Sequence, residues 1–525
     1  MVVSFTVLLL CLVWSHAVEG SKTDNGKKSQ ELAKSLGSVV VVGAGVAGLA
    51  AARSLSNSGQ WDVTVLEARR ERYGGRVWTD RINFDRAKGL EADLGIVMFD
   101  DDDPENMLSE FLGPFEVSPK RIEFKQLIDG NTNKVYRDLE FENLAQIHQQ
   151  LLMAAVQTSS SPTRDVSLQE AVDNLYRLQP VFKETLPPNV FNTLTLARYN
   201  LAPKLISCRS LKSRFNLLPN TVIEEGLQEV LDRLVSGVEL EEAPLNLEMN
   251  KVVSQIKIAQ VDNTSKVLVR TKDRRQKKAD AVIVAVPLGV LKASRIAFDP
   301  MLPVEKRVAL NSLEVSSVNS VVFKFASIFW PKDTELFHFA ASDMSEIGLM
   351  TTWLNTGWLS RRKDPYLTTF IQGNTATKFG NYSDTQLKTI ALERLAAMFH
   401  LKNLSKDAIL SVTTSNWAAD PFSQGLLSYP TVGMSQTQWD AVSKPVCPHI
   451  YFANDYTDST RFGTIQGAFR SGLRAAEHLM QGCHGNVPHP KMRYLKEPKG
   501  SRKRGQGKKQ LRATVKVNRT KKEEL

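Results

Sequence analysis

Apolar runs and helical periodicities alternate along the first part of the chain. Residues 39–42 are four consecutive valines, a pattern typical of a buried parallel strand. An Ala- and Leu-rich helix is predicted over 49–55, and DVTVLEA, 62–68, predicts a second strand. Later patterns, ENLAQIHQQLLMAAVQ and TQLKTIALERLAAMF, indicate further helices. The succession of strand, helix and strand predicts an α/β fold.

The segment NSVVFKFASIFW, 319–330, has the alternation of a half-buried strand. Its valine and phenylalanine at odd positions fall on one face, whereas Ser320 and Lys324 fall on the other. Lys324 is the one ionisable residue in this segment. The pattern alone leaves open whether the strand is plain core or borders a reaction site.

The N-terminus has the pattern of a secretory signal peptide. An apolar run at 7–14 precedes a small-x-small ending at 15–17, so we expect a signal peptide over 1–17 and a polar linker over 18–36. This run is too short to span a bilayer, and no other segment approaches ~18 apolar residues. In the secretory pathway, the sequons become candidate glycosylation sites: Asn263, Asn381, Asn403 and Asn518.

The net charge of +11 is concentrated at the C-terminus. Residues 491–525 hold 14 Lys or Arg against 3 Asp or Glu, which leaves 53 basic and 53 acidic residues elsewhere. We expect a basic, disordered tail over 483–525, either as a polyanion-binding segment or as a solvated end. The terminal Lys-Glu-Glu-Leu resembles an endoplasmic reticulum retention address, so secretion and retention in the lumen both stay open. The cysteine spacing suits no metal site.

A dinucleotide-binding motif follows the first strand. Gly43-x-Gly45-x-x-Gly48 supplies a tight turn, close approach of the backbone to a pyrophosphate, and close packing of helix on strand. The helix N-terminus would face the phosphates. Glu67, 24 residues after Gly43, is placed for a ribose hydroxyl. The order of these features predicts a nucleotide site.

The next residues indicate which cofactor this site takes. Gly74-Gly75-Arg76 comes just after the acidic strand end. A nicotinamide dehydrogenase does not need this element. In a flavoprotein, the glycine pair turns the chain under the pyrophosphate and the arginine supplies a cation. The sequence therefore favours FAD.

These motifs together resemble the flavin-containing amine oxidases, a family that includes monoamine oxidases, polyamine oxidases and lysine-specific histone demethylases. The resemblance spans roughly residues 37–482. It rests on EAR, 67–69; GGR, 74–76; ADLG, 92–95; ADAVIVAVPLGVL, 279–291; FDPMLP, 298–303; NWAADPFSQG, 416–425; and YFANDYTDSTRFGTIQGAFRSGLRAA, 451–476.

The resemblance implies a Rossmann-type FAD-binding domain with an interleaved α+β substrate domain. The FAD-binding domain is expected over 37–99, 210–300 and 411–482. The substrate domain is expected over 100–209 and 301–410. FAD should be non-covalent, because Leu426 stands where some relatives have a cysteine bonded to the flavin.

By the same resemblance, a set of residues should bind FAD through phosphate, ribose, flavin and adenine contacts. They are Gly43, Gly45, Ala47, Gly48, Glu67, Arg69, Gly75, Arg76, Val97, Met98, Val253, Trp417, Asp455, Thr464 and Ile465. Asp455 replaces the family's glutamate and keeps its charge. Thr464 and Ile465 begin a helix whose backbone N–H groups can face the flavin.

The resemblance also implies the chemistry: hydride transfer from an amine to flavin N5, hydrolysis of the imine, and reoxidation by O₂ with release of H₂O₂. Two devices of the family are changed here. Ser320 stands at the position of a lysine that assists the reaction with O₂, and Lys324 lies ~13 Å farther along the strand. The flanking aromatic positions fall on Leu427 and Thr464, although a shift of two would bring in Tyr429.

Three functions stay open on the sequence. The first is a secreted-type amine oxidase acting on a polyamine or another cationic amine, which the acidic stretch 100–105 could attract. The second is an FAD-binding protein with weak or lost oxidase activity, acting as a matrix component through its basic tail. The third is an L-amino-acid oxidase, which would need a cation for the substrate carboxylate.

Overall fold

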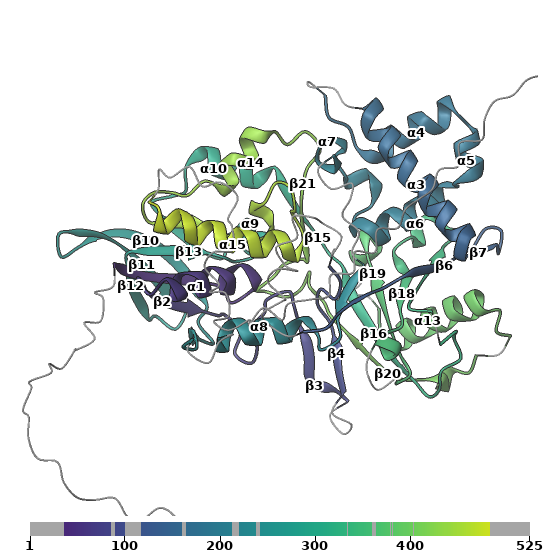
Figure 1. Ribbon diagram of the computed structural model, residues 1–525, viewed down its shortest axis with the longest axis horizontal. Helices are drawn as coiled ribbons and strands as arrows, with labels where there is room; N and C mark the ends of the chain where they lie inside the picture. The colour runs from purple at the N-terminus through teal and green to yellow at the C-terminus, as the bar shows by residue number, and fades with distance from the viewer. Residues whose placement is uncertain are drawn as a thin grey trace, which may run out of the picture. The chain divides into compact units, whose positions relative to one another are not determined.

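A computed structural model describes residues 36–85, 90–99, 117–159, 164–212, 220–237, 242–332, 334–359, 364–378, 380, 382–402 and 404–482, all within one compact unit (Figure 1). The expected signal peptide, the acidic stretch 100–105, the basic tail and three of the sequons (Asn381, Asn403 and Asn518) lie outside the described residues.

A five-stranded parallel sheet is assembled from three separate stretches of the chain. β1 (Gly37–Val42) pairs with β2 (Trp61–Leu66) on one side and β13 (Ala281–Val284) on the other, and β9 (Asn246–Glu248) and β22 (Ile450–Phe452) are the edges. The valine run of β1 is buried, as its composition requires. The α/β fold class predicted from the sequence is confirmed.

Two helices pack closely beside this sheet. α1 (Val46–Ser58) is longer than the predicted helix 49–55 and lies against α15 (Ile465–Met480). A Cβ at Gly472 of α15 would lie 2.2 Å from the Ala47 carbonyl oxygen, so only glycine permits this approach. α8 (Leu227–Ser236) contributes its buried leucines to the same hydrophobic cluster.

A four-stranded sheet is formed by residues 253–299, which lie between and just after strands β9 and β13 of the first sheet in the chain. It comprises β10 (Val253–Val261), β11 (Thr264–Thr271), β12 (Gln276–Ala279) and β14 (Ala297–Asp299), in the order β12-β11-β10-β14. The two-residue turn between β10 and β11 holds Asp262 and Asn263 at φ 51° and 63°, values that match a type I′ hairpin turn. Asn263, one of the four sequons, therefore lies at an exposed turn.

A seven-stranded mixed sheet forms the second large element. Its strand order is β20 (Ile409–Thr414), β16 (Asn319–Phe325), β19 (Tyr366–Ile371), β18 (Leu349–Leu354), β17 (Leu336–Ala340), β6 (Phe124–Asp129) and β7 (Val135–Arg137). The expectation that 319–330 is half-buried is wrong. β16 lies between two partner strands, and six of its seven residues are buried because both faces are covered.

Helices cover this sheet on both sides. Successive residues of β6 split between two clusters: Ile128 packs with α13 (Asp384–Phe399), and Leu127 packs with α3 (Asp138–Thr158), α4 (Leu168–Leu178) and α6 (Pro188–Tyr199). Both later helices predicted from the sequence are thus confirmed, as α3 and α13 (Figure 1).

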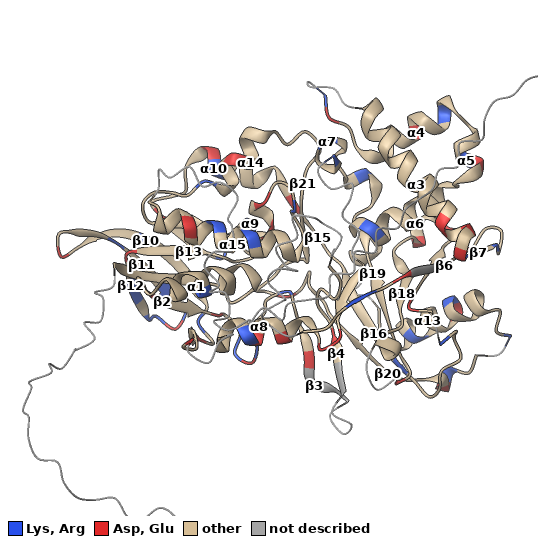
Figure 2. Cartoon of the chain, in the orientation of Figure 1, with Lys and Arg blue, Asp and Glu red and all other residues tan. Residues whose placement is uncertain are grey.

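The remaining elements are short. The strands are β3 (Thr79–Asp85), β4 (Leu90–Asp93), β5 (Pro119–Arg121), β8 (Thr221–Ile223), β15 (Leu313–Ser316) and β21 (Leu427–Pro430). The helices are α5 (Val181–Thr185), α7 (Cys208–Leu211), α9 (Leu288–Lys292), α10 (Val304–Asn311), α11 (Thr356–Leu359), α12 (Gly373–Ala376) and α14 (Gln436–Ser443). Among the described residues, no helix is long and apolar enough to span a bilayer. Charges of both signs are interspersed over the described elements (Figure 2).

Candidate active site

A large first cavity opens at the carboxyl ends of the parallel strands. It spans about 1160 Å³, space open to solvent included, and begins at Val42, Leu66 and Ala285, where β1, β2 and β13 end. Ligands of open α/β sheets bind at this edge, outside the carboxyl ends of the strands. The first cavity is lined by most of the predicted FAD-binding residues: Gly43, Gly45, Ala47, Glu67, Arg69, Gly75, Arg76, Val253, Asp455, Thr464 and Ile465.

The glycine motif shapes one wall of the first cavity. Gly43 has φ 105°, a left-handed conformation that glycine adopts without strain. A Cβ at Gly48 would lie 1.9 Å from the Gly43 carbonyl oxygen, so this glycine lets α1 pack on β1. Gly45 is different, because a Cβ there would meet no protein atom closer than 3.9 Å. The space above Gly45 is therefore left for a ligand.

Charged groups in the first cavity are anchored by their neighbours. The buried Glu67 carboxylate accepts hydrogen bonds from the backbone N–H groups of Ala44 and Arg69, both at 2.9 Å. Arg76 donates to the Leu426 carbonyl at 2.7 Å and forms an ion pair with Asp455. Asp455, although shorter than the family's glutamate, is thus long enough to contact Arg76.

Three lysine or arginine residues of the first cavity were missed by the sequence analysis: Lys251, Lys272 and Arg295. They come from turns and loop ends that carry no motif. Together with Arg69 and Arg76 they outnumber the two carboxylates, Glu67 and Asp455, among the described lining residues. A cradle with this excess of cations and a bare glycine wall fits the diphosphate of FAD.

A second cavity continues from the first. It spans about 890 Å³, space open to solvent included, and shares Ile96, Gly463, Thr464 and Ile465 with the first cavity. The structure brings together here all three positions predicted to act in catalysis, Ser320, Leu427 and Thr464. The predicted flavin neighbours Val97 and Met98 also line it. The functional roles of these residues stay predictions.

Ser320 is held firmly in the wall of the second cavity. It is 1% exposed, and its backbone N–H donates to Ser415 Oγ at 2.9 Å while its carbonyl accepts from the Ser415 N–H at 3.0 Å. Phe370 lies opposite it on β19 and lines the same cavity. Lys324, on the same strand, is not among the described lining residues of either cavity.

Leu427 and Thr464, the two positions where the resemblance predicts an aromatic pair, both line the second cavity without an aromatic ring. Tyr429 does not line the second cavity; it borders a smaller third cavity together with Tyr199. The aromatic residues that do line the second cavity are Phe99, Tyr199 and Phe370. They come from three distant parts of the chain, and no local pattern marked them.

Two arginines line the second cavity, and no described Asp or Glu does. Arg198, at the end of α6, donates to Gln149 Oε1 and lies over the Tyr199 ring, 5.4 Å from its centroid. Arg461 is 7% exposed. The sequence analysis assigned a role to neither residue: Arg198 ends a helix without a motif, and Arg461 lies within the segment 451–476 but was not singled out.

The N-terminus of α15 faces both cavities. Thr464 is its N-cap: the Thr464 hydroxyl donates to the Arg461 carbonyl at 2.7 Å and accepts from the Gly467 N–H at 3.0 Å. The positive end of the helix dipole is thereby directed at the junction of the cavities. A negative charge that develops there would be stabilised.

Trp417 is absent from the described lining of both cavities. Its buried indole N–H donates to the Leu94 carbonyl at 3.1 Å, and Trp78 packs against it edge-on, with ring centroids 6.0 Å apart. The Arg72 guanidinium lies over Trp78, and burial, followed by the charge of Arg69, lowers the pKa of Arg72 to about 9. The predicted cofactor contact of Trp417 stays a prediction.

Comparison with known families matches residues 46–480 to the flavin containing amine oxidoreductases. The chain is 28% identical to polyamine oxidase 2 of Arabidopsis thaliana, covering 84% of this chain and 87% of that protein. It is also 28% identical to lysine-specific histone demethylase 1 homolog 3 of A. thaliana, covering 84% of this chain but 30% of that longer protein.

Solved structures show the same fold. A putrescine oxidase bound to putrescine superposes with a TM-score of 0.67 at 20% identity, covering 85% of this chain and 99% of that one.

Proposed function

Since the chain belongs to the family of flavin containing amine oxidoreductases, we propose that it is an FAD-dependent oxidase that oxidises the C–N bond of an amine. The overall reaction consumes the amine, O₂ and water, and gives a carbonyl compound, the released amine or ammonia, and H₂O₂. One observation carries this proposal: the first cavity, shaped for a dinucleotide, opens into the second through four shared residues.

When bound, FAD supplies the two-electron acceptor that takes a hydride from the carbon next to nitrogen and passes the electrons to O₂. The chain supplies the binding and the electrostatics. Gly45 and the basic residues would hold the diphosphate, and Glu67 the ribose. The α15 N-terminus would stabilise negative charge at the junction of the cavities.

The second cavity is suited to keep the amine unprotonated. Its described lining is mostly apolar, and its charged members are Arg198 and Arg461. Removal from water and nearby positive charge both lower the pKa of an amine. A neutral amine is the form whose carbon can give up a hydride, so this lining favours the reactive species.

The uncharged Ser320 supports an alternative, an FAD-binding protein with weak or lost oxidase activity. The experiment that separates the two uses purified full-length protein. An oxidase shows a flavin spectrum, is bleached by its amine under anaerobic conditions, and releases H₂O₂ in air. Substrates to assay are spermine, spermidine, N-acetylated polyamines, monoamines and L-amino acids. A yellow protein that none of these bleaches would refute the oxidase.

Arg198 and Arg461 also favour a second candidate, an amino-acid oxidase, because an arginine pairs readily with a carboxylate. Matched amines decide between the candidates. Lysine against cadaverine, and phenylalanine against phenylethylamine, differ in the carboxylate alone. A lower KM for the carboxylated member of each pair, lost in Arg198→Gln, supports the amino-acid oxidase. The opposite order supports an oxidase of cationic amines.

Flavin attachment and cellular location are further parts of the proposal. Leu426 lines the second cavity at the position of the bonding cysteine, which supports non-covalent FAD; acid precipitation should then leave the flavin in solution. The signal-peptide pattern supports the secretory pathway, as does the disulfide-bonded state of Cys447. Secretion and retention in the lumen are separated by localising the chain with and without its last four residues.

The basic tail is proposed to bind polyanions such as heparin-like glycans. Its support is the charge count, with all eleven surplus positive charges in residues 491–525. Retention on a heparin column should fall to that of a neutral protein when the chain ends at residue 482. Unchanged retention would assign the tail to the solvated alternative.

A further inference from the structure

A hairpin of the four-stranded sheet carries the triplet Asn263-Thr264-Ser265 at its tip. β10 and β11 pair as far as Val261 and Thr264, so Asp262 and Asn263 alone make the turn (Figure 1). Asn263 is exposed, and its side-chain amide forms no hydrogen bond with the described part of the chain. The sequon therefore presents its amide to solvent.

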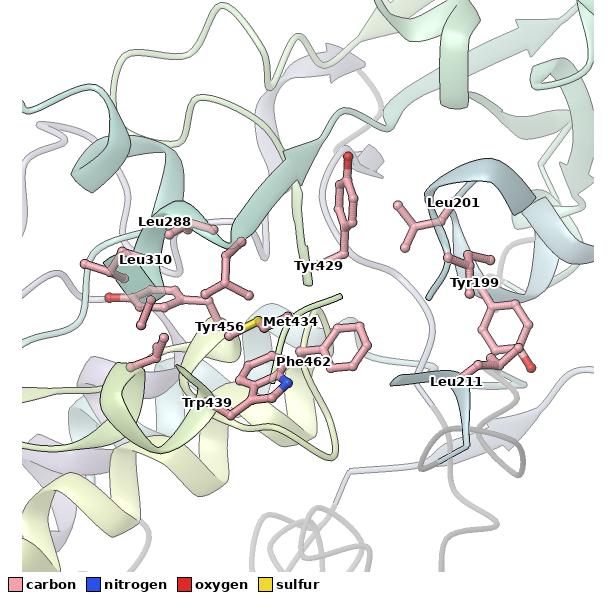
Figure 3. Close-up of a cluster of buried hydrophobic side chains, with 14 of the residues drawn as sticks. Tyr199, Leu201, Leu211, Leu288, Leu310, Tyr429, Met434, Trp439, Tyr456 and Phe462 are labelled. Carbon is pink, nitrogen blue, oxygen red and sulfur yellow. The ribbon is translucent and has the colours of Figure 1, made fainter. Parts of the chain in front are cut away.

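The base and the tip of this hairpin differ in what holds them. Ile256, Val267 and Val269 belong to a large hydrophobic cluster. Figure 3 shows another part of the same cluster, around Tyr456. Residues 259–265 contribute no side chain to it. The hairpin is thus anchored by its base, and a bulky group on the turn would displace nothing from the core.

Two observations support synthesis of this segment into the secretory lumen. They are the signal-peptide pattern over 1–17 and the disulfide-bonded state of Cys447. Asn-x-Ser is a glycosylation acceptor there unless x is proline, and x is Thr264 here. In the transfer, Asn263 Nδ2 bonds to C1 of a sugar and loses one proton. The bond from that carbon to a lipid-linked pyrophosphate breaks, and the pyrophosphate leaves with the electron pair.

We propose that Asn263 carries an N-linked glycan. The glycan lies away from the candidate active site, because β10 has Val253, a lining residue of the first cavity, at one end and Val261 at the other. The nine residues of β10, rising about 3.3 Å each, separate the two ends by about 26 Å. The inference goes beyond the proposed oxidase and does not depend on it.

Peptide mapping of the full chain, expressed in a eukaryotic cell line from its own N-terminus, tests this modification. Trypsin cuts after Lys257 and Lys266, so residues 258–266 form one peptide that holds this sequon and none of the other three. Peptide N-glycosidase converts a glycosylated asparagine to aspartate, which the mass of the peptide reveals. We expect aspartate at position 263 after this treatment and not before it. Asparagine at 263 in most copies of the treated protein overturns the proposal.

Three variants separate the glycan from the turn. Asn263→Gly removes the acceptor but keeps the turn, because Asp-Gly is a favoured pair in a type I′ turn. Ser265→Ala leaves the asparagine in place and should lose the glycan all the same, whereas Ser265→Thr keeps the hydroxyl and should retain it. The first two should show the same loss of apparent mass on a gel. A Ser265→Ala protein that keeps the modification overturns the assignment to an N-linked glycan.

Flavin content keeps this inference separate from the oxidase. Because the turn lies far from the first cavity, Asn263→Gly should hold as much FAD as the wild type, and a loss of flavin in this variant would contradict that separation. A glycosylated protein that oxidises no amine refutes the oxidase and leaves the glycan standing. An active oxidase with an unmodified Asn263 refutes the glycan and leaves the oxidase standing.

Discussion

The first and second cavities share four residues, but they hold their charges in different ways. In the first cavity, Glu67 is fixed by two backbone N–H groups, and Arg76 is paired with Asp455. In the second, the described charges are two arginines with no described carboxylate among the lining residues. The comparison teaches that the predicted cofactor residues are held by backbone and ion-pair contacts, whereas the charges of the second cavity come from arginines that the sequence analysis did not name.

The largest effect is expected from breaking the ion pair of the first cavity. Asp455 is 2% exposed and the Arg76 side chain 11%, so Asp455→Ala removes the carboxylate that pairs with a largely covered arginine. We expect the free energy of unfolding to fall by about 3–5 kcal/mol. Urea unfolding of the holoprotein measures it. Asp455→Glu, which restores the family's acid, is the control, and a loss in that variant as large as in Asp455→Ala would refute the pairing argument.

Acid should lower the free energy of unfolding through His148, which lies between α3 and α6. His148, buried on α3, contacts Thr195 Oγ1 of α6 at 2.9 Å, and burial lowers its pKa to about 3. The unfolded chain therefore takes up the proton first, and stability is lost as pH falls from 6.5 toward 3. Between pH 6.5 and 5 this amounts to about 2 kcal/mol.

The variant His148→Gln checks this dependence of the free energy of unfolding on pH. The glutamine amide can still reach Thr195 and does not titrate, so the variant should lose less stability than the wild type over the same pH interval. The measurement is urea unfolding at pH 6.5 and pH 5. His338, whose pKa is lowered to about 4 by burial, should keep part of the slope in the variant. Identical slopes in both proteins would show that His148 titrates normally.

Gly45→Ala tests whether Gly45 leaves room for the cofactor, whereas Gly48 allows α1 to pack on β1. The added Cβ finds no protein atom within 3.9 Å and extends into the ligand space, whereas a Cβ at Gly48 would strike the Gly43 carbonyl. We expect Gly45→Ala to weaken FAD binding at least about tenfold, which is about 1.4 kcal/mol, with the unfolding of the apoprotein unchanged. Gly48→Ala should destabilise the apoprotein as well. Full flavin occupancy in Gly45→Ala would contradict this placement of the diphosphate.

The same contrast explains what could be predicted from the sequence. The first cavity is formed largely by short motifs, so Gly43 and Glu67 were assigned from spacing, and Arg76 from the glycine pair before it and from the resemblance. Lys272 and Arg295 were missed, because turns without a motif carry them into the cavity. In the second cavity, Ser320 was placed through the resemblance, but Arg198 and Tyr199 meet it only through the packing of α6 beside the seven-stranded sheet. Such long-range contacts leave no local pattern.

The buried strand β16 shows the same limit. Alternation of residue types predicted one exposed face, yet Ser320 and Val322 are buried as well. Their burial follows from segments that cover this face and are distant in sequence; Ala92 and Leu94, for example, pack against Val322. A pattern along one strand reports its own residues and not the segments that cover it.

The most direct test of the second cavity concerns Ser320, where the expected effect is no larger than that of Gly45→Ala. Ser320→Lys restores the family's residue at a position that already faces the cavity. A positive charge there favours the formation of anionic oxygen species, so reoxidation of the flavin by O₂ should become at least about tenfold faster. Stopped-flow mixing of anaerobically reduced protein with O₂ measures this rate. Ser320→Met is the matched control, because it adds a chain of similar length without the charge. If both variants reoxidise at the same rate, bulk rather than charge governs the step; if Ser320→Lys is unchanged or slower than wild type, the residue does not stand where the reaction with O₂ takes place.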